Sequence, residues 1–272
     1  MNISFFGPET TFTHLAALKH FGEKNTFVPK KSISEVFESV EKKETDFGVV
    51  PVENSTEGSV AHTFDSFFDS KLKIIAEIVI PIEQCLLSGS GKKNITKIFS
   101  HPQPIGQCRK YLAKNFSNAE IVEAPSTAAA ALLASKEKNS AAIASCLAAE
   151  KFGLKIIERG INDEHDNQTR FLVIGNKIPK ITGKDKTSIL FSTKNVPGAL
   201  YKVLGIFSKY NINMTKIESR PSKKKTWEVV FFIDFEGHEG DEKIKKALLE
   251  LHEYCDFLNV LGSYPEKVGI IE

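Results

Sequence analysis

Strands and helices alternate through the first two-thirds of the chain, and this alternation restricts the possible folds more than any other feature. Short apolar runs at 3–6, 26–28 and 47–50 are typical of strands. The segments that begin at Phe12 and Ser34 carry apolar residues at helical spacing. This β-α-β-α order predicts a largely parallel sheet with helices on both faces.

A longer strand-rich segment, 74–87, interrupts the alternation and leads into a second α/β set. The chain then returns through a strand at 170–174. We therefore expect one α/β lobe, a crossover to a second lobe and a crossover back. The two lobes of this domain, residues 1–178, would enclose a cleft, which is a usual place for a small-molecule site.

Residues 179–186 form a polar segment with Pro and Gly, which predicts a linker between domains. Residues 187–272 then read βαββαβ, the α+β ferredoxin-like order. The strand at 227–235 is apolar on both faces. One face would pack on the two helices, and the other predicts a partner surface.

Composition excludes several classes of function. The 272 residues include 36 basic and 34 acidic side chains, a net charge of +2, which argues against nucleic acid as a partner. Lys223–Lys225 is read as a solvated turn. No apolar run approaches the ~20 residues that span a bilayer, so no membrane contact is expected. The start of the chain does not resemble a signal peptide, and we expect a cytoplasmic protein.

The cysteines and one acidic loop are the candidate metal ligands of the sequence. Cys85, Cys108, Cys146 and Cys255 fit neither a zinc site nor a disulfide framework, so all are predicted to be buried thiols. The loop 162–166 carries His165 among acidic residues, but its ligands are crowded. A solvated loop is the better interpretation, and no metal is expected.

The stretch Asn167–Phe171 offers a hydroxyl, a guanidinium and an aromatic ring at the start of a buried strand. Side chains alternate along a strand, so Thr169 and Phe171 should share one face. Phe171 would then be an apolar wall of the cleft. Arg170 should point the other way, and for it a structural ion pair and a substrate contact both stay open.

Several stretches together resemble one family, the prephenate dehydratases. The motifs are Gly7-Pro8-Glu9-Thr10-Thr11-Phe12, Pro51-Val52-Glu53-Asn54-Ser55 with Gly58-Ser59-Val60, Ser100-His101-Pro102-Gln103, Ala141-Ala142-Ile143-Ala144-Ser145 and Asn167-Gln168-Thr169-Arg170-Phe171. Residues 187–272 resemble the ACT domain that follows this catalytic domain. Its phenylalanine-binding motifs are matched by Gly198-Ala199-Leu200 and Glu218-Ser219-Arg220-Pro221. One departure is Thr10, where the family usually has a second Gly.

The resemblance implies the two-lobed fold of type 2 periplasmic binding proteins for the catalytic domain. It also implies conversion of prephenate to phenylpyruvate, water and carbon dioxide without a cofactor. Phenylalanine would be the allosteric inhibitor, bound between copies of the chain in a homodimer or homotetramer. Arogenate dehydratase, acting on the amino-acid analogue, and a non-catalytic sensor are the alternatives.

The chemistry gives the expected site residues their roles. Expelling hydroxide needs a donor at the leaving hydroxyl, and the resemblance assigns this importance to Thr169, with Arg170 and Phe171 beside it. The substrate-binding candidates follow a strand end or open a helix, where backbone N–H groups can hold a carboxylate. They are Glu53, Asn54, Ser55, Thr56 and Gln103. For each of them a helix cap is the alternative.

Overall fold

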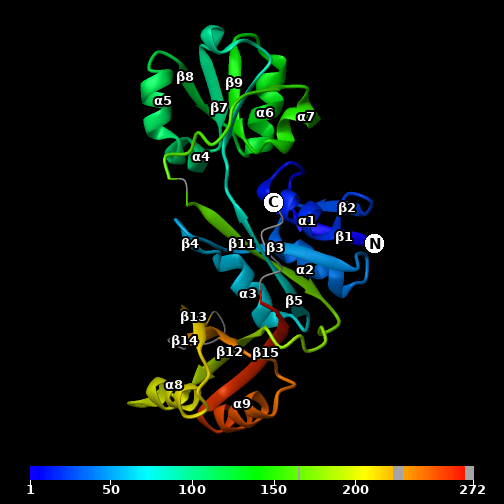
Figure 1. Ribbon diagram of the computed structural model, residues 1–272, viewed down its shortest axis with the longest axis vertical. Coiled ribbons are helices and arrows are strands. Elements are labelled where there is room, and N and C mark those ends of the chain that lie inside the picture. Colours follow the sequence, from blue (N-terminus) through cyan, green and yellow to red (C-terminus); the bar gives the residue numbers. More distant parts are fainter. Residues whose placement is uncertain (165, 223–228, 267–272) are drawn as a thin grey trace.

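The computed structural model describes residues 1–164, 166–222 and 229–266. Three bodies follow one another along its long axis: a second lobe at one end, a first lobe in the middle and the C-terminal domain at the other end (Figure 1). Within the described residues, none of the helices has the length and the apolar character that a membrane crossing requires. The turn expected at Lys223–Lys225 lies outside the described residues.

The first lobe is built on a mixed sheet of strand order β2-β1-β3-β11-β5. Its elements are β1 (Asn2–Phe6), α1 (Phe12–Phe21), β2 (Thr26–Lys30), α2 (Ile33–Glu41), β3 (Phe47–Asn54), β4 (Gly58–Ser59), α3 (Ala61–Asp69), β5 (Lys73–Pro81) and β11 (Gln168–Gly175). Strands β1, β2 and β3 are parallel, as expected. Strand β11 is antiparallel to both neighbours, because it returns from the second lobe.

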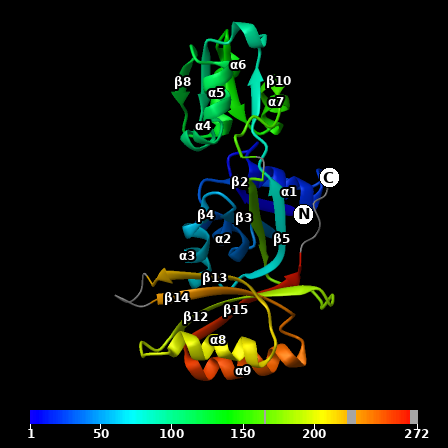
Figure 2. The same cartoon turned by 60° about the vertical axis from the view of Figure 1, so that its left-hand side comes forward.

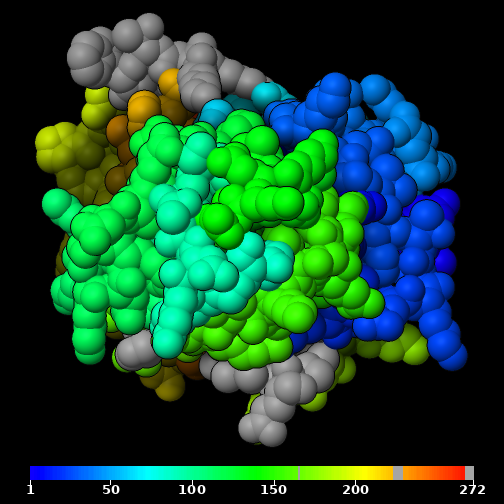
Figure 3. Space-filling view, turned by 90° about the horizontal axis from the view of Figure 1, so that it is seen from above, coloured from blue at the N-terminus to red at the C-terminus, as the bar shows by residue number. Residues whose placement is uncertain are grey.

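The second lobe has a five-stranded sheet of order β10-β6-β9-β7-β8. Its elements are β6 (Cys85–Ser88), η1 (Lys92–Asn94), β7 (Lys97–Ser100), α4 (Pro102–Gln107), α5 (Arg109–Asn115), β8 (Glu120–Glu123), α6 (Thr127–Lys136), β9 (Ser140–Ala144), α7 (Leu147–Phe152) and β10 (Lys155–Glu158). Seen from above, this lobe faces the viewer, and the N-terminal part of the first lobe extends beyond it on one side (Figure 3). The expected two-lobed fold is confirmed.

The C-terminal domain is a four-stranded antiparallel sheet, β13-β14-β12-β15, with both helices on one face (Figure 2). Its elements are β12 (Asp185–Thr193), α8 (Ala199–Lys209), β13 (Met214–Pro221), β14 (Val229–Glu236), α9 (Glu242–Tyr254) and β15 (Cys255–Pro265). This order confirms the ferredoxin-like prediction.

The other face of this C-terminal sheet is covered by the first lobe of the same chain. Buried Phe64, Phe67 and Ile74 form one apolar cluster with Leu190 and Phe232 of the sheet. The rings of Phe64 and Phe232 meet edge to face, with centroids 4.7 Å apart. The partner surface predicted from the sequence is thus a contact between domains, and it gives no evidence for a second molecule.

Two of the four cysteines form a disulfide, which corrects the prediction of four thiols. Cys85 and Cys146 are 61 residues apart in the sequence, yet their Cα atoms lie 5.8 Å apart. Cys85 pairs with Ala144 across β6 and β9, just before Cys146, and this register brings the two sulfurs together. Spacing rules detect local clusters and miss such a pair. Cys108 and Cys255 are buried thiols, as expected.

Candidate active site

Two neighbouring strands of the first lobe bring the central motif residues together. Strands β3 and β11 run antiparallel, and their register places Thr169 opposite Asn54 and Arg170 opposite Glu53. Because successive side chains alternate, each strand contributes one residue to each face of the sheet. The two pairs therefore lie on opposite faces, and they have different surroundings.

The Asn54 side chain is the centre of the first pair. Its Nδ2 donates to Asn167 Oδ1 at 2.7 Å and to Thr169 Oγ1 at 2.8 Å. Its Oδ1 accepts from the backbone N–H groups of Thr56 and Glu57, both at 3.0 Å. These bonds on both ends of the amide fix its orientation.

The Thr169 hydroxyl is consequently oriented by its neighbour. Thr169 is 9% exposed, and its oxygen accepts the hydrogen bond from Asn54. A hydroxyl has one hydrogen to donate and two lone pairs to accept with. Asn54 occupies an acceptor position, and none of the described residues accepts the hydrogen of Thr169, so this hydroxyl can donate to a ligand.

The loop after β3 differs in detail from the expectation. The backbone N–H groups of Thr56 and Glu57 are bonded to Asn54 and do not offer a free carboxylate site. Ser55 instead ties this loop to the return crossover: its N–H donates to Gln168 O, and its hydroxyl accepts from Gln168 N, both at 2.9 Å. Ser55 and Thr56 are exposed at the edge of the site.

Helix α4 contributes polar groups from the second lobe. Gln103 is exposed near its start, and its N–H donates to the capping His101 Nδ1 at 3.4 Å. Gln107, which sequence reasoning missed, reaches Glu57 of the first lobe at 3.4 Å and accepts from Gln84 at 3.1 Å. The signal was present in the sequence, because Gln107 lies one helical turn after Gln103 on the same face.

Thr10 occupies a contact between the lobes. Its carbonyl oxygen accepts a hydrogen bond from Ser145 Oγ of the second lobe at 2.5 Å. Its φ of 70° lies in the left-handed region, which favours glycine. The loop therefore adopts the conformation that the usual Gly would allow. The buried Thr10 Oγ1 has no hydrogen-bond partner among the described residues.

Among the other expected site residues, Arg170 and Glu53 form ion pairs, and Phe171 is buried. Arg170 bonds to Glu77 at 2.7 Å and to Asp234 of the C-terminal domain at 2.6 Å, so it makes the structural ion pair. Glu53 pairs with Lys216 of β13 at 2.7 Å. Phe171 is 1% exposed and packs inside the first lobe, because its position along β11 directs it into that lobe's core.

The two motifs of the C-terminal domain lie at one end of its sheet. Ser192, near the end of β12, pairs with Val230, which pairs with Arg220. Gly198 caps α8 with a φ of 77°, and Ala199 and Leu200 form its first turn. Alternation along β13 gives Glu218 and Ser219 different surroundings: Glu218 accepts from Ser59 of the first lobe at 2.9 Å, whereas Ser219 is exposed.

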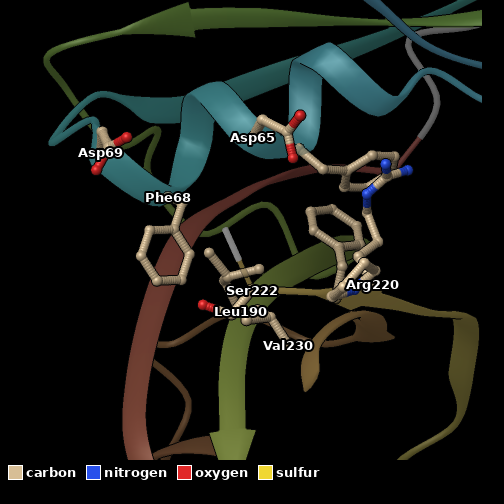
Figure 4. A pocket seen from close by; sticks show the side chains of 10 residues that line it. Asp65, Phe68, Asp69, Leu190, Arg220, Ser222 and Val230 are labelled. Atoms are coloured by element: carbon tan, nitrogen blue, oxygen red, sulfur yellow. The ribbon is translucent and has the colours of Figure 1, made fainter. Parts of the chain in front are cut away.

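Arg220 and Pro221 line a pocket of about 100 Å³ between the domains. Figure 4 shows Arg220 extending from the sheet toward α3, which carries Asp65 and Asp69. The apolar part of the lining includes Phe64, Phe68, Leu190, Val230 and Phe232. The four residues of the Glu218–Pro221 motif therefore have different surroundings, and their part in a phenylalanine site stays a prediction.

Other features of the catalytic domain do not add to this site. A groove of about 730 Å³ lies between α1 and α7, and none of the expected site residues line it. Among the described residues, no three His, Cys, Asp or Glu side chains cluster as metal ligands. His165 lies outside the described residues.

The fold and the site define a class: a two-lobed α/β domain with an oriented hydroxyl, fused to a ferredoxin-like regulatory module. Two family models match the chain, "Prephenate dehydratase" over residues 3–179 and "ACT domain" over residues 187–253. A bifunctional chorismate mutase/prephenate dehydratase from Aquifex aeolicus is 51% identical over 269 residues, covering 98% of this chain and 74% of its own length. A prephenate dehydratase from Methanocaldococcus jannaschii is 42% identical, covering 86% of each chain.

A solved structure agrees with these matches. The prephenate dehydratase of Arthrobacter aurescens, in complex with L-Phe, superimposes with a TM-score of 0.90 at 32% identity. The alignment covers 100% of this chain and 93% of that one. The chain belongs to the prephenate dehydratase family and carries its ACT domain.

Proposed function

We propose that the chain is a hydro-lyase that converts prephenate to phenylpyruvate, water and carbon dioxide. The observation that carries this proposal is the Asn54–Thr169 hydrogen bond, which leaves the hydrogen of the Thr169 hydroxyl available for a leaving group. Family membership supplies the substrate class. The reaction belongs to the biosynthesis of phenylalanine, and a cytoplasmic location is part of this proposal.

The residues act on a reaction that is driven by aromatisation. The ring carboxylate leaves as carbon dioxide, and the electron pair of the broken bond enters the ring as the hydroxyl departs. A threonine hydroxyl is too weak an acid to transfer a full proton unaided. Thr169 instead donates a hydrogen bond to negative charge that develops on the departing oxygen. The departing hydroxide takes its proton from solvent and becomes the water product.

Neutral polar groups surround this donor in the cleft. Asn54 orients Thr169, and Ser55 fixes the crossover that carries it. Thr56 and Gln103, exposed at the edges of the two lobes, are the proposed contacts for the substrate carboxylates. Arg170 is occupied in its ion pairs and makes no substrate contact in this proposal.

The test incubates the purified chain with prephenate and, separately, with arogenate, and follows the aromatic products. Phenylpyruvate from prephenate, at a kcat/KM at least tenfold above that for formation of phenylalanine from arogenate, supports the proposal. A preference for arogenate would replace it with the amino-acid substrate. No aromatic product from either compound would favour a non-catalytic sensor.

Phenylalanine regulation is proposed to require a second copy of the chain. Strand β13 is an edge of the C-terminal sheet, and Ser219 and Ile217 are exposed on it. Tyr201, near the start of α8, is 80% exposed. An open edge beside exposed apolar residues suits a homodimer or homotetramer in which Gly198–Leu200 of one copy meets Ser219 of another.

Sedimentation and inhibition assays test this regulatory proposal. The parent should sediment as a dimer or tetramer and be inhibited by phenylalanine. Ser219→Ala should keep its turnover and respond at least tenfold more weakly to phenylalanine. A monomer with full inhibition, or unchanged inhibition of Ser219→Ala, would place the phenylalanine site elsewhere.

A further inference from the structure

Arg170, the residue that follows the proposed donor Thr169, extends its side chain to the C-terminal domain. Thr169 is held by Asn54 within the first lobe, whereas Arg170 reaches across the domain junction to the C-terminal sheet. The opposite strand repeats this division, since Asn54 holds Thr169 and Glu53 pairs with Lys216 of β13. Both strands that build the active site are therefore held, one residue away from it, by the regulatory domain.

The junction behind Thr169 is a closed network of hydrogen bonds and ion pairs. Arg170 Nη1 donates to Asp234 at 2.6 Å, and Arg170 Nη2 donates to the Tyr264 hydroxyl at 3.0 Å. Ser188 donates to the other oxygen of Asp234 at 2.5 Å and lies 2.7 Å from the Tyr264 hydroxyl. Asp234, Tyr264 and Ser188 are each 0% exposed and belong to the regulatory domain.

The remaining charges of this network are Glu77 of the catalytic domain and Lys186 of the regulatory domain. Glu77 of β5 is 2% exposed, accepts from Arg170 Nε at 2.7 Å and pairs with Lys186 of β12 at 2.8 Å. Two cations, Arg170 and Lys186, are thus balanced by two carboxylates, Glu77 and Asp234. Burial lowers the pKa of Arg170, but Asp234, Tyr264 and Glu77 together outweigh this effect and keep that pKa above its usual range.

We infer that Asp234 is a positioning residue for the reaction: a regulatory-domain carboxylate that holds Arg170 and, through strand β11, sets the place of Thr169. The inference rests on the proposed function of Thr169. A guanidinium gripped by Asp234, Glu77 and Tyr264 has little freedom to shift along or rotate about its strand. Since Thr169 is the adjacent residue, a loosened Arg170 changes the position of the donor.

A donor displaced by a fraction of an ångström still lies in the cleft but is misaligned with the departing oxygen. Misplacement of about 1 Å can cost ~10²-fold in rate. Substrate binding depends on other groups, at the edges of the lobes. The positioning role therefore predicts a fall in kcat at nearly constant KM. If Asp234 only held the two domains together, its substitution would lower stability alone.

Asp234→Asn is the main test variant, because it keeps the shape of the side chain and removes its charge. Tyr264→Phe is the milder second variant, which removes one hydroxyl from Arg170 and stays folded if Asp234→Asn does not. Lys73→Met is the matched control. Lys73 also bridges the domains, from β5 to the Val260 carbonyl, but it pairs in register with Gly175 at the far end of β11.

The parent and each full-length variant are assayed with prephenate at one common temperature, at least 20 °C below the lowest Tm of the set, so that all are folded. We expect kcat of Asp234→Asn to fall about tenfold to a hundredfold, with KM within twofold of the parent. Tyr264→Phe should show a smaller fall in the same parameter. Lys73→Met should keep the parent kcat although its Tm is lower.

Three outcomes overturn the inference. They are a kcat of Asp234→Asn within twofold of the parent, an equal fall in kcat for Lys73→Met, and, if Asp234→Asn does not fold, a Tyr264→Phe variant with the parent kcat. These outcomes differ from a failure of the proposed function, in which the parent itself forms no phenylpyruvate from prephenate.

Discussion

The two faces of the β3–β11 strand pair carry different kinds of side chain, although the residues concerned are adjacent in the sequence. On the cleft face the groups are neutral: Asn54, Asn167 and Thr169 are joined by amide and hydroxyl hydrogen bonds. On the junction face Arg170 and Glu53 form ion pairs with the regulatory domain. Successive residues of a single motif therefore have different roles, because they point to opposite faces of the sheet.

This contrast shows how a regulatory domain can influence the position of active-site residues although it contributes no residue to the active site. The cleft face needs a correctly placed weak donor, which only fixed neighbours can provide. The junction face supplies that fixation through buried charges, and an unpaired buried charge is strongly destabilising. Changes on the cleft face should thus lower turnover alone, whereas changes at the junction should lower stability as well.

Truncation of Phe64 should have the largest effect on stability and would sharpen this contrast. Phe64 of α3 is 3% exposed and packs against Phe232 across the junction. Phe64→Ala should lower the free energy of unfolding by about 3–5 kcal/mol. Denaturant titration measures this change, with Phe64→Leu as the milder control. A loss below about 1 kcal/mol would mean that the junction contributes little to the fold.

Removal of the Asn54 amide should affect turnover more than binding. Asn54→Ala deletes the donor that orients Thr169. We expect kcat to fall about tenfold to a hundredfold with a nearly constant KM. Steady-state kinetics with prephenate distinguish this role from the carboxylate anchor expected from the sequence, which would raise KM instead. Ser55→Ala removes the bond to Gln168 and leaves Asn54 in place, so its kcat should fall less than that of Asn54→Ala.

Thr10 offers a stabilising change at the contact between the lobes. Its φ of 70° is strained for a β-branched residue, and its buried hydroxyl has no partner among the described residues. Thr10→Gly should raise the free energy of unfolding by about 1 kcal/mol, after the greater freedom of Gly in the unfolded chain is subtracted. Thr10→Ala, which keeps a Cβ at positive φ, should gain less. A less stable Thr10→Gly variant would contradict this interpretation of the loop.

The smallest expected effect is a dependence of stability on pH through His14. His14 Nδ1 accepts a hydrogen bond from Thr10 N, which requires an unprotonated nitrogen, and burial lowers the pKa of His14 below 6.5. The unfolded chain then binds more protons than the folded one, so stability falls as the pH drops below about 6.5. Unfolding at pH 7.5 and 5.5 should show a smaller loss for His14→Asn than for the parent. Equal losses would assign the dependence to other groups.

The sequence was sufficient for the parts of the fold that local patterns determine. The lobes, the ferredoxin-like order and the alternation of Thr169 and Arg170 follow from periodicity, and the family motifs named the domain pair. What the sequence could not supply were contacts between distant segments. The Arg170–Asp234 pair, the Cys85–Cys146 disulfide and the covered sheet face each depend on how strands far apart in the chain pack together.

The positions of Glu53 and Phe171 likewise could not be read from their motifs alone. Glu53 and Phe171 lie in motifs that contain cleft residues, so proximity in sequence favoured proximity in the site. The pleat directs Glu53 toward Lys216, whereas Phe171 keeps the face of Thr169 and lies farther along β11, in the core of the first lobe. Gln107 was missed because its partners, Gln84 and Glu57, come from other segments of the chain.

The central claim, that Thr169 acts as the oriented donor, is tested most directly by kcat for prephenate in Thr169→Ser and Thr169→Val. Serine keeps the hydroxyl, so its kcat should stay within about tenfold of the parent. Valine keeps the shape and removes the donor, so its kcat should fall about 10²–10³-fold while KM and Tm stay unchanged. A Thr169→Val enzyme within about threefold of the parent rate would contradict the claim.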